Sequence, residues 1–376
     1  MMSFKELMDK VGQARLAELP FVIYRKPDES MIHAMIQKDR RLDLVNSFER
    51  SGFIMAPFKN SDSAVLISKD NALFHSCPCE IDKPTNILGN YSAEDVVLTE
   101  NEKDAHLQLV RKAKSFMKDK PVSKVVVSRQ ETIIPDSFEL QTVFERLVST
   151  YPSAFVYLWC HPEIGSWAGA TPETLLKTRG PVFRTMSLAG TKKFEGVTDV
   201  SWDAKELNEQ QLVTDHIVDA LEGTNFVVGQ TYTQKAGNLL HICTEIGGRL
   251  NPGDSVSDWI KKLHPTAAVC GFPKKEAERF ILAQEGYERS FYTGFLGELN
   301  FETVPEKTPS MNSKVQVHSS LFVNLRCMQI HGKNNDKVSL YIGGGITAAS
   351  DPHAEWQETV DKSFVMKSIL GGSQQG

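Results

Sequence analysis

Lysine and glutamate occupy two points of this sequence where the neighbouring residues are apolar. Lys124 lies inside the run SKVVVSR, and Glu173 follows Pro172 in AGATPETLL. Burial favours the neutral amine of a lysine, which is a general base, and the protonated carboxyl of a glutamate, which is a general acid. Each residue taken alone also has a simpler interpretation, as an edge-strand lysine that reaches solvent and as a surface carboxylate.

A predicted helix over 204–223 carries two carboxylates near its start. Glu209 lies four residues before Val213 and extends the apolar stripe of the helix, and Glu206 lies on nearly the same face. A buried carboxylate is costly unless a cation, an arginine or a metal meets it. The alternative is that this first turn lies beyond the core, where the helix dipole favours acids.

A second predicted helix, over 353–370, repeats this arrangement. Glu355, Glu358 and Lys362 share one face. An exposed Glu358–Lys362 pair would contribute only about 0.3–0.5 kcal/mol. Carboxylates from two helices would instead suit Mg²⁺, which binds through one or two carboxylates together with waters and substrate oxygens. Whether Glu206 and Glu355 would touch such a metal directly or through water stays open.

One arginine and a run of three glycines are further candidates for binding a ligand. Arg326 stands among apolar residues in FVNLRCM, which is expected to be a strand, and its planar fork suits a carboxylate, although a surface arginine is the default for it alone. The run Gly343 to Gly345 follows a strand without GK[ST] or GxGxxG, which disfavours a nucleotide site and favours close approach of a ligand to the backbone. Together these residues predict a site for a small, carboxylate-rich molecule with Mg²⁺.

The elements that must position these residues alternate between runs of strands and helices, which favours an α+β fold with large antiparallel sheets. AFVYLWCHP, TLLKTR and FRTMSLAG are predicted to be consecutive strands of one sheet, and VQVHSSLFVNLRCMQIHG a single strand. Asp136 and Ser137 are candidate helix caps, the polar segment 85–101 is the best internal boundary, and 371–376 resembles a frayed tail. Helices are predicted over 3–19, 102–120, 137–152, 204–223 and 353–370, with two short ones flanking HPTAAVCGFP.

Composition limits the classes of partner. The 376 residues include 42 Lys+Arg and 47 Asp+Glu, a net charge of −5, and 41% are hydrophobic. This balance argues against nucleic acid or an anionic membrane held by bulk charge. Six cysteines without a CxxC pair indicate neither a disulfide scaffold nor a zinc site, and the charged N-terminus is unlike a signal peptide. We therefore expect a cytoplasmic protein with reduced thiols and no membrane span.

Ten sequence blocks together resemble the chorismate-utilising enzymes, and within them the isochorismate synthase branch. In order they are SKVVVSR, GATPETLL, SLAGTKK, KELNEQQLV, HICTEIGG, LHPTAAVCGFP, FYTGFLGEL, NLRC, YIGGGI and EWQETVDK. The resemblance covers about 123–370 and leaves 1–122 as a divergent part. It implies one domain over 1–376, built as a large antiparallel β-sandwich wrapped by helices.

The resemblance also implies an isomerase, which converts chorismate and water reversibly to isochorismate. Lys124 matches the base that activates water for attack at ring carbon 2, and Glu173 the acid that protonates the departing hydroxyl at carbon 4. Glu209 and Glu358 match the Mg²⁺ carboxylates. The positions that match the substrate lining are Gly190, Thr191, Ala268, Arg326, Gly343 and Lys362.

The branch assignment depends on few residues. Anthranilate synthases typically carry glutamine where Lys124 stands, and aminodeoxychorismate synthases a lysine where Ala189 stands, so this pair implies water as the nucleophile. Salicylate synthases share the lysine and then expel pyruvate, which makes them the rival interpretation. Asn208 to Gln210 replaces the commoner HEH, and HPTAA replaces HPTPA; neither change removes a charged catalytic group.

The resemblance implies a monomer without a glutaminase subunit, whose product feeds menaquinone or siderophore biosynthesis. A hypothesis of another class is a non-catalytic chorismate-binding subunit. Retention of both Lys124 and Glu173 argues against that hypothesis, since a pure binder needs neither.

Overall fold

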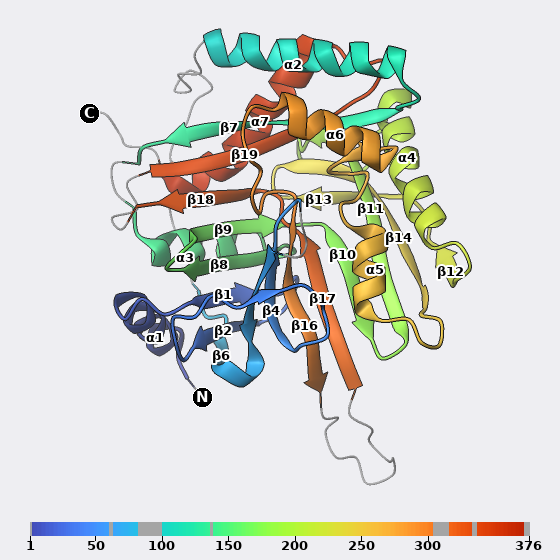
Figure 1. Cartoon of the computed structure of the whole chain (residues 1–376). Helices are drawn as coiled ribbons and strands as arrows, with labels where there is room; N and C mark the ends of the chain where they lie inside the picture. The colour runs from blue at the N-terminus through green and yellow to red at the C-terminus, as the bar shows by residue number, and fades with distance from the viewer. Residues whose placement is uncertain are drawn as a thin grey trace.

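Two large antiparallel sheets pack against each other and are wrapped by helices in the computed structural model of the chain (Figure 1). The structure describes residues 2–59, 63–81, 100–135, 138–303, 316–332 and 337–371. Aromatic and aliphatic side chains from both sheets, such as Tyr157, Trp167, Leu296 and Phe322, fill the space between them. The predicted α+β class with a large antiparallel sandwich is confirmed.

The first sheet has nine strands within the described residues, each antiparallel to its neighbours. In spatial order they are β15 (Gly271–Phe272), β7 (Lys124–Ile133), β19 (Lys337–Ile346), β18 (Cys327–His331), β9 (Gly165–Thr171), β8 (Phe155–His161), β1 (Phe21–Arg25), β2 (Met31–Gln37) and β6 (Ala72–Pro78).

The second sheet has ten strands in the described part of the chain, and its pairs are antiparallel as well. In spatial order they are β12 (Asn225–Val228), β14 (Leu239–Arg249), β11 (Val182–Lys193), β10 (Thr174–Arg179), β17 (Gln316–Val323), β16 (Phe295–Thr303), β4 (Gly52–Ala56), β5 (Ala64–Ser68) and β3 (Leu44–Val45), with β13 (Tyr232–Ala236) also paired to β14.

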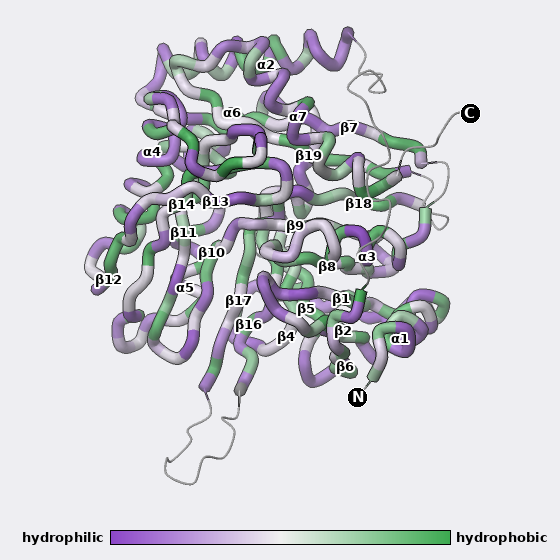
Figure 2. The backbone as a smooth tube through the Cα atoms, turned by 180° about the vertical axis from the view of Figure 1, so that it is seen from behind, coloured by the Kyte–Doolittle hydropathy of each residue, from purple (hydrophilic) through white to green (hydrophobic). Residues whose placement is uncertain are grey.

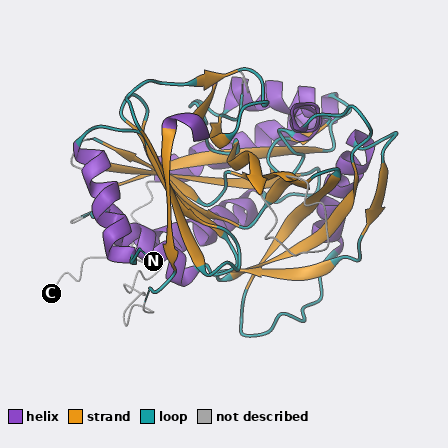
Figure 3. Ribbon diagram, turned by 90° about the horizontal axis from the view of Figure 1, so that it is seen from below, coloured by secondary structure: helices purple, strands orange, loops and turns teal. Residues whose placement is uncertain are grey.

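Helices cover the outer faces of both sheets (Figure 3). α1, α3 and α7 pack their apolar residues on the nine-stranded sheet, α4 and α5 pack on the ten-stranded sheet, and α2 and α6 lie over β7. Along α2, hydrophilic and hydrophobic segments alternate, as expected of an amphipathic surface helix (Figure 2). The helices are α1 (Phe4–Leu16), α2 (Glu100–Asp119), α3 (Leu140–Thr150), α4 (Ala204–Ala220), α5 (Val256–Leu263), α6 (Lys274–Gln284) and α7 (Pro352–Leu370), with a 3₁₀ turn at Lys69–Asn71.

The start of α7 is fixed by its cap. The Asp351 side chain accepts hydrogen bonds from the backbone N–H groups of His353 and Ala354, at 3.0 and 2.9 Å, and Pro352 occupies the first helical position. Both features are favourable at a helix N-terminus. They set the first turn of α7, which carries Glu355.

Two predictions about strands were wrong. β8 belongs to the nine-stranded sheet whereas β10 and β11 belong to the ten-stranded sheet, and the small-residue strand β9 (GSWAGAT) lies between β8 and β10 in the sequence. VQVHSSLFVNLRCMQIHG is not one strand either, because it forms β17 and β18, which lie in different sheets.

The crossover between β17 and β18 is held by a buried asparagine. Tyr157 donates a hydrogen bond to Asn324 Oδ1 (2.7 Å), and Asn324 Nδ2 donates to the carbonyl of Phe291 (2.9 Å). Arg326 lies two residues further on, in the crossover, and its φ of 47° is not that of a strand. The prediction that Arg326 lies in a strand was wrong. The carbonyl of Arg326 accepts a hydrogen bond from Ala170 N, which ties the crossover to β9.

Among the described residues, no helix has the length and apolarity needed to cross a bilayer. The predicted caps Asp136 and Ser137, almost all of the proposed boundary 85–101 and the tail 372–376 lie outside the described residues.

Candidate active site

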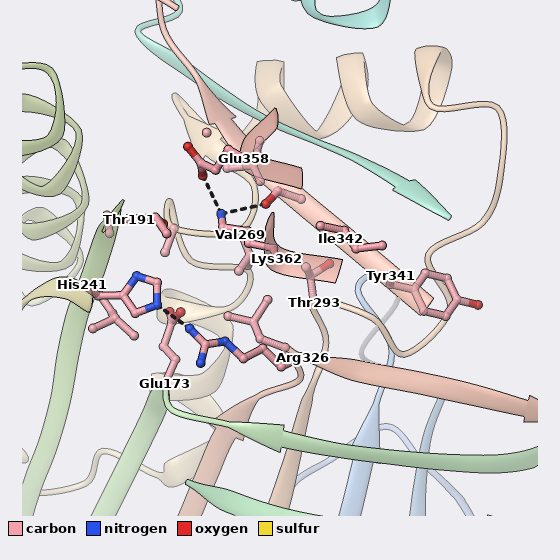
Figure 4. Close-up of a pocket in the computed structure, with 18 of the residues that line it drawn as sticks. Glu173, Thr191, His241, Val269, Thr293, Arg326, Tyr341, Ile342, Glu358 and Lys362 are labelled. Carbon is pink, nitrogen blue, oxygen red and sulfur yellow. Dashed lines mark hydrogen bonds and ion pairs between the residues drawn. The ribbon is translucent and has the colours of Figure 1, made fainter. Parts of the chain in front are cut away.

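Nine of the ten predicted site residues line one pocket, which lies where the two sheets meet. β19 supplies the glycine strand, β11 and β14 supply the opposite wall, and α4 and α7 contribute side chains at the rim. Figure 4 shows Glu173, His241 and Arg326 at one side of this pocket and Glu358 and Lys362 at the other. The nine are Glu173, Gly190, Thr191, Glu209, Ala268, Arg326, Gly343, Glu358 and Lys362.

Glu173 is buried immediately before β10, with 2% of its surface exposed. Its Oε1 accepts a hydrogen bond from Thr266 Oγ1 at 3.4 Å, and its backbone carbonyl accepts one from Val323. Burial raises the pKa of Glu173 to about 8, although the charge of Lys124 works in the opposite direction. A substantial protonated fraction therefore exists at neutral pH, as general acid catalysis requires. The alternative of a surface carboxylate is wrong.

Lys124, the tenth predicted residue, is fully buried at the start of β7 and lies next to the pocket through Glu209. Lys124 does not stand on a sheet edge, because β15 pairs with this end of β7. Its Nζ lies 2.9 Å from Glu209 Oε1 and has no hydrogen-bond partner of good geometry among the described residues. The edge-strand interpretation is therefore wrong, whereas the neutral amine stays a prediction.

Three lysines face three of the four predicted carboxylates. Besides the Lys124–Glu209 pair, Lys205 Nζ lies 2.8 Å from Glu355 Oε1, and Lys362 Nζ lies 2.7 Å from Glu358 Oε1. Lys362 also donates to the carbonyl of Gly343 at 3.0 Å. These pairs join α4, α7, β7 and β19 around the end of the glycine strand.

The two carboxylates of α7 differ in their electrostatics. Burial, and then the negative charge of Glu358, raises the pKa of Glu355, although Lys205 partly offsets this. Burial also acts to raise the pKa of Glu358, but Lys362, Lys205 and Lys124 outweigh it, so that this pKa is lowered. Glu358 is thus held as a carboxylate at neutral pH.

The carboxylate cluster fits a hard cation. Glu206 Oε2 and Glu355 Oε2 are buried without a hydrogen-bond partner among the described residues. A Cβ at Gly345 would lie 2.2 Å from Glu209 Oε1, and one at Gly344 would lie 3.5 Å from Glu355 Oε2, so glycine leaves room for these groups. Unpartnered carboxylate oxygens of this kind are ligands that Mg²⁺ prefers.

No three acidic, histidine or cysteine side chains of the described residues are already gathered as a metal site. Three of the carboxylates are instead paired one by one with Lys124, Lys205 and Lys362. Glu209 and Glu358 as metal ligands therefore stay a prediction.

Arg326 is oriented by a histidine that the sequence analysis did not single out. Arg326 Nη1 donates to the carbonyl of Ala236 at 2.7 Å, and Nη2 donates to His241 Nε2 (Figure 4). Arginine can only donate, so Nε2 is the acceptor and the His241 Nδ1–H donates to the carbonyl of Gly190 at 2.7 Å. Burial, reinforced by the charge of Arg326, lowers the pKa of His241 far below its usual range. His241 is therefore neutral, and the guanidinium is aimed by two acceptors.

Arg326 keeps its charge in this half-buried position. Desolvation lowers its pKa to about 10, which still leaves it protonated at neutral pH. A guanidinium that donates to neutral acceptors retains its positive charge for a ligand carboxylate. The only sequence signal for His241 was a histidine inside the apolar strand NLLHICTEI.

Backbone irregularities shape the remaining wall. Gly190 has φ 68°, and the pairing of β11 with β14 shifts between Ala189 and Lys192, so Gly190 and Thr191 lie in a bulge at the pocket. Ala268 lies in the turn between α5 and β15. A Cβ at Gly343 would lie 2.6 Å from the Tyr292 hydroxyl, which also lines the pocket and was not predicted.

The chain matches the family described as Chorismate binding enzyme over residues 79–371. Isochorismate synthase EntC of Escherichia coli strain K12 is 26% identical over 276 residues, which cover 70% of this chain and 66% of that protein. Isochorismate synthase MenF of Bacillus subtilis strain 168 is 28% identical over 288 residues, which cover 73% of this chain and 57% of that protein. In both cases the aligned part of this chain spans less than two thirds of the length of the relative.

Solved structures share the fold. The menaquinone-specific isochorismate synthase MenF from Escherichia coli superposes with a TM-score of 0.72 at 21% identity and covers 93% of this chain and 88% of that chain. Anthranilate synthase component I from Streptococcus pneumoniae TIGR4 superposes with a TM-score of 0.62 at 16% identity and covers 93% of this chain and 90% of that chain. The architecture is therefore that of chorismate-utilising enzymes.

Proposed function

The chain belongs to the chorismate-binding enzyme family, and on that premise we propose that it is an isochorismate synthase. The observation that carries the proposal is the pairing of a fully buried lysine, Lys124, with a buried glutamate, Glu173, whose pKa is raised to about 8. A family member that only bound chorismate would need neither group. Two named relatives to which this chain is similar, EntC of Escherichia coli and MenF of Bacillus subtilis, are isochorismate synthases.

The proposed reaction needs one proton acceptor and one proton donor. Lys124, as a neutral amine, accepts a proton from water while the water oxygen forms a bond to ring carbon 2. The ring double bond shifts, the bond from carbon 4 to its hydroxyl breaks, and Glu173 donates the proton that lets this oxygen leave as water. Atoms balance, because one water enters and one departs. Each proton transfer typically contributes about 10²–10⁴-fold to the rate.

The remaining residues bind and orient the substrate. Arg326, aimed by His241, is suited to pair with a substrate carboxylate, and Gly190 and Gly343 let the ring lie against the backbone. Mg²⁺, held by Glu209 and Glu358 with Glu206 and Glu355 close by, would neutralise a second carboxylate of the dianionic substrate. Ala189 leaves no lysine amine at the ring for covalent attack, which favours water as the nucleophile.

The test is product analysis after incubation with chorismate, Mg²⁺ and water labelled with ¹⁸O. Isochorismate carrying one ¹⁸O at carbon 2 is the expected product, and EDTA should prevent its formation. Salicylate with pyruvate as the main products would instead assign the chain to salicylate synthases. Calorimetric binding of chorismate without any product would indicate a binding subunit.

The proposal extends to assembly and place of action. Because water and not ammonia is the nucleophile, the enzyme needs no glutaminase subunit, and we infer a monomer that acts in the cytoplasm. Size-exclusion chromatography with light scattering of the purified chain tests the monomer, for which the mass expected from the sequence is 42.0 kDa.

A further inference from the structure

The first half of α4 is held to the ten-stranded sheet by a polar contact and not by apolar packing. Glu206 and Glu209 lie in its first two turns, but the buried residues of the helix begin only at Gln210. Leu207, the large apolar side chain of these turns, is 47% exposed. Ile217 and other apolar residues anchor only the second half. Lys124 and Glu355 hold these turns to β7 and α7 through ion pairs, so the contact that holds them to the ten-stranded sheet is the amide of Gln210.

Gln210 donates into a cluster of buried hydroxyls. Its Nε2 lies 2.8 Å from Thr244 Oγ1, 3.0 Å from Ser187 Oγ and 3.0 Å from Thr214 Oγ1. Ser187 Oγ and Thr214 Oγ1 lie 2.7 Å apart, and Thr244 Oγ1 lies 2.8 Å from Thr231 Oγ1. An amide has only two N–H groups, so two of the three hydroxyls accept well at one time and the third shares a proton.

Two of the three hydroxyls that Gln210 contacts belong to strands of the pocket wall, whereas Thr214 lies on α4 itself. Ser187 on β11 pairs directly with Thr244 on β14. Ser187 stands three residues before Gly190, and Thr244 stands three residues after His241. The hydrogen bond between His241 and Gly190 fixes the imidazole that accepts from Arg326. The amide thus joins the carboxylate-bearing turns of α4 to the strands that carry the substrate side of the site.

We propose that Gln210 is a positioning residue, which sets the distance and direction of Glu206 and Glu209 toward a bound Mg²⁺ by clamping the first half of α4 to Ser187 and Thr244. The inference rests on the proposed function, because it takes Mg²⁺ as the cation of the carboxylate cluster. It goes beyond that function in assigning a role to a residue that touches neither metal nor substrate. Groups that hydrogen-bond directly to metal ligands typically change metal affinity by about 10–100-fold when they are removed. Gln210 acts through the helix that carries the ligands, so we expect an effect at the lower end of that range.

The experiment titrates Mg²⁺ alone into the metal-free full chain by calorimetry and compares Gln210→Met, which keeps the length of the side chain and removes its hydrogen bonds. The dissociation constant for Mg²⁺ should rise about tenfold. In turnover assays the Mg²⁺ concentration for half-maximal rate should rise by the same factor, while kcat at saturating Mg²⁺ stays within about twofold. Ile217→Val is the matched control, since it weakens the apolar anchor of the same helix and should leave Mg²⁺ affinity unchanged.

A second variant tests the same inference if Gln210→Met does not fold. Thr244→Val removes one acceptor of the amide, and should raise the dissociation constant for Mg²⁺ in the same direction by a smaller factor. Wild-type protein that binds Mg²⁺, together with variants that bind it equally well, would overturn the positioning role and leave the proposed function intact. Wild-type protein that binds no Mg²⁺ would overturn both the metal assignment and this inference.

Discussion

Glu173 changes its charge state on folding, since burial raises its pKa from 4.5 to about 8. At pH values between these two, the folded chain binds a proton that the unfolded chain has released, so folding stability falls as pH rises. Glu173→Gln removes this dependence. The free energy of unfolding of wild type should therefore fall relative to that of Glu173→Gln between about pH 5 and 8, by roughly 3–5 kcal/mol. Urea unfolding at several pH values measures it, and parallel curves for the two proteins would contradict the raised pKa.

The same pKa sets the expected pH profile of catalysis. A general acid must be protonated, so kcat/KM for chorismate should decline above about pH 8. Glu173→Gln should show little activity at any pH. An unchanged kcat/KM up to pH 9.5 would show that Glu173 is not the acid in the free enzyme.

Lys124 is predicted to act as a base, which accepts a proton from water. Two substitutions distinguish this role from a purely electrostatic effect of its positive charge. Lys124→Gln should lower kcat by about 10²–10⁴-fold while chorismate and Mg²⁺ still bind in calorimetric titrations. Lys124→Arg is the matched variant, because it keeps a positive charge beside Glu209 but cannot release a proton near neutral pH. Substantial activity in Lys124→Arg would assign an electrostatic role to Lys124 instead of a basic one.

At the scale of elements, the crossover from β17 to β18 determines where Arg326 lies. Asn324→Ala would leave the Tyr157 hydroxyl and the Phe291 carbonyl without their buried partner, at a cost of roughly 2–5 kcal/mol of stability. Because Arg326 follows two residues later, KM for chorismate should rise as well. Chemical denaturation and steady-state kinetics measure the two effects.

The matched control for Asn324 is another asparagine that bonds a backbone carbonyl. Asn300 Nδ2 donates to Phe48 O at 2.8 Å, and Asn300 does not line the pocket. Asn300→Ala should destabilise the fold and leave KM for chorismate unchanged. An equal rise of KM in both variants would mean that the effect at Asn324 is one of general stability.

Local patterns in the sequence were sufficient to predict the helices and the class of fold. The apolar periodicity of 102–120 and 353–370, for example, corresponds to α2 and α7. The crossover could not be predicted, because the apolar run continues on both sides of Asn324 and resembles one long strand. The chain turns there because Asn324 bonds Tyr157 and Phe291, which are distant in the sequence. β9 was missed because its small residues lack the usual signature of a strand.

For the site, residue types alone made Lys124, Glu173 and the four carboxylates candidates, and their roles as base, acid and metal ligands stay predictions. The lysine partners could not be predicted, because Lys205 and Glu355 are 150 residues apart and meet only through the packing of α4 and α7. The same holds for His241 and Arg326, whose contact joins β14 to the crossover. The resemblance to a known family supplied the ring positions and the identity of the substrate, which no spacing could give.

At the scale of the whole molecule, binding of Mg²⁺ should couple to folding stability. A metal that binds only the folded chain stabilises it, by about 2.7 kcal/mol at a concentration one hundred times the dissociation constant. We expect Mg²⁺ to raise the midpoint of thermal unfolding, EDTA to reverse the shift, and chorismate to add to it only when Mg²⁺ is present. Differential scanning calorimetry of wild type and Glu209→Gln tests this expectation, and an equal shift in both would place the metal elsewhere.

A buried carboxylate outside the pocket provides the control. Glu298 accepts a hydrogen bond from Tyr24 and pairs with Lys26, and Glu298 does not line the pocket. Glu298→Gln should lower the unfolding midpoint but retain the shift caused by Mg²⁺. Loss of the shift in this variant would show that the response reports general stability.

Two of the predicted site residues lie where the chain passes from one sheet to the other: Glu173 between β9 and β10, and Arg326 between β17 and β18. Lys124 and Gly343 belong to the first sheet, whereas Gly190 and His241 belong to the second. An intermediate with only one sheet formed would thus lack part of the pocket wall, and it would leave Glu173 and Arg326 without one of the two strands that fix their positions. We therefore expect that, during refolding, turnover of chorismate returns only after the two sheets have packed against each other.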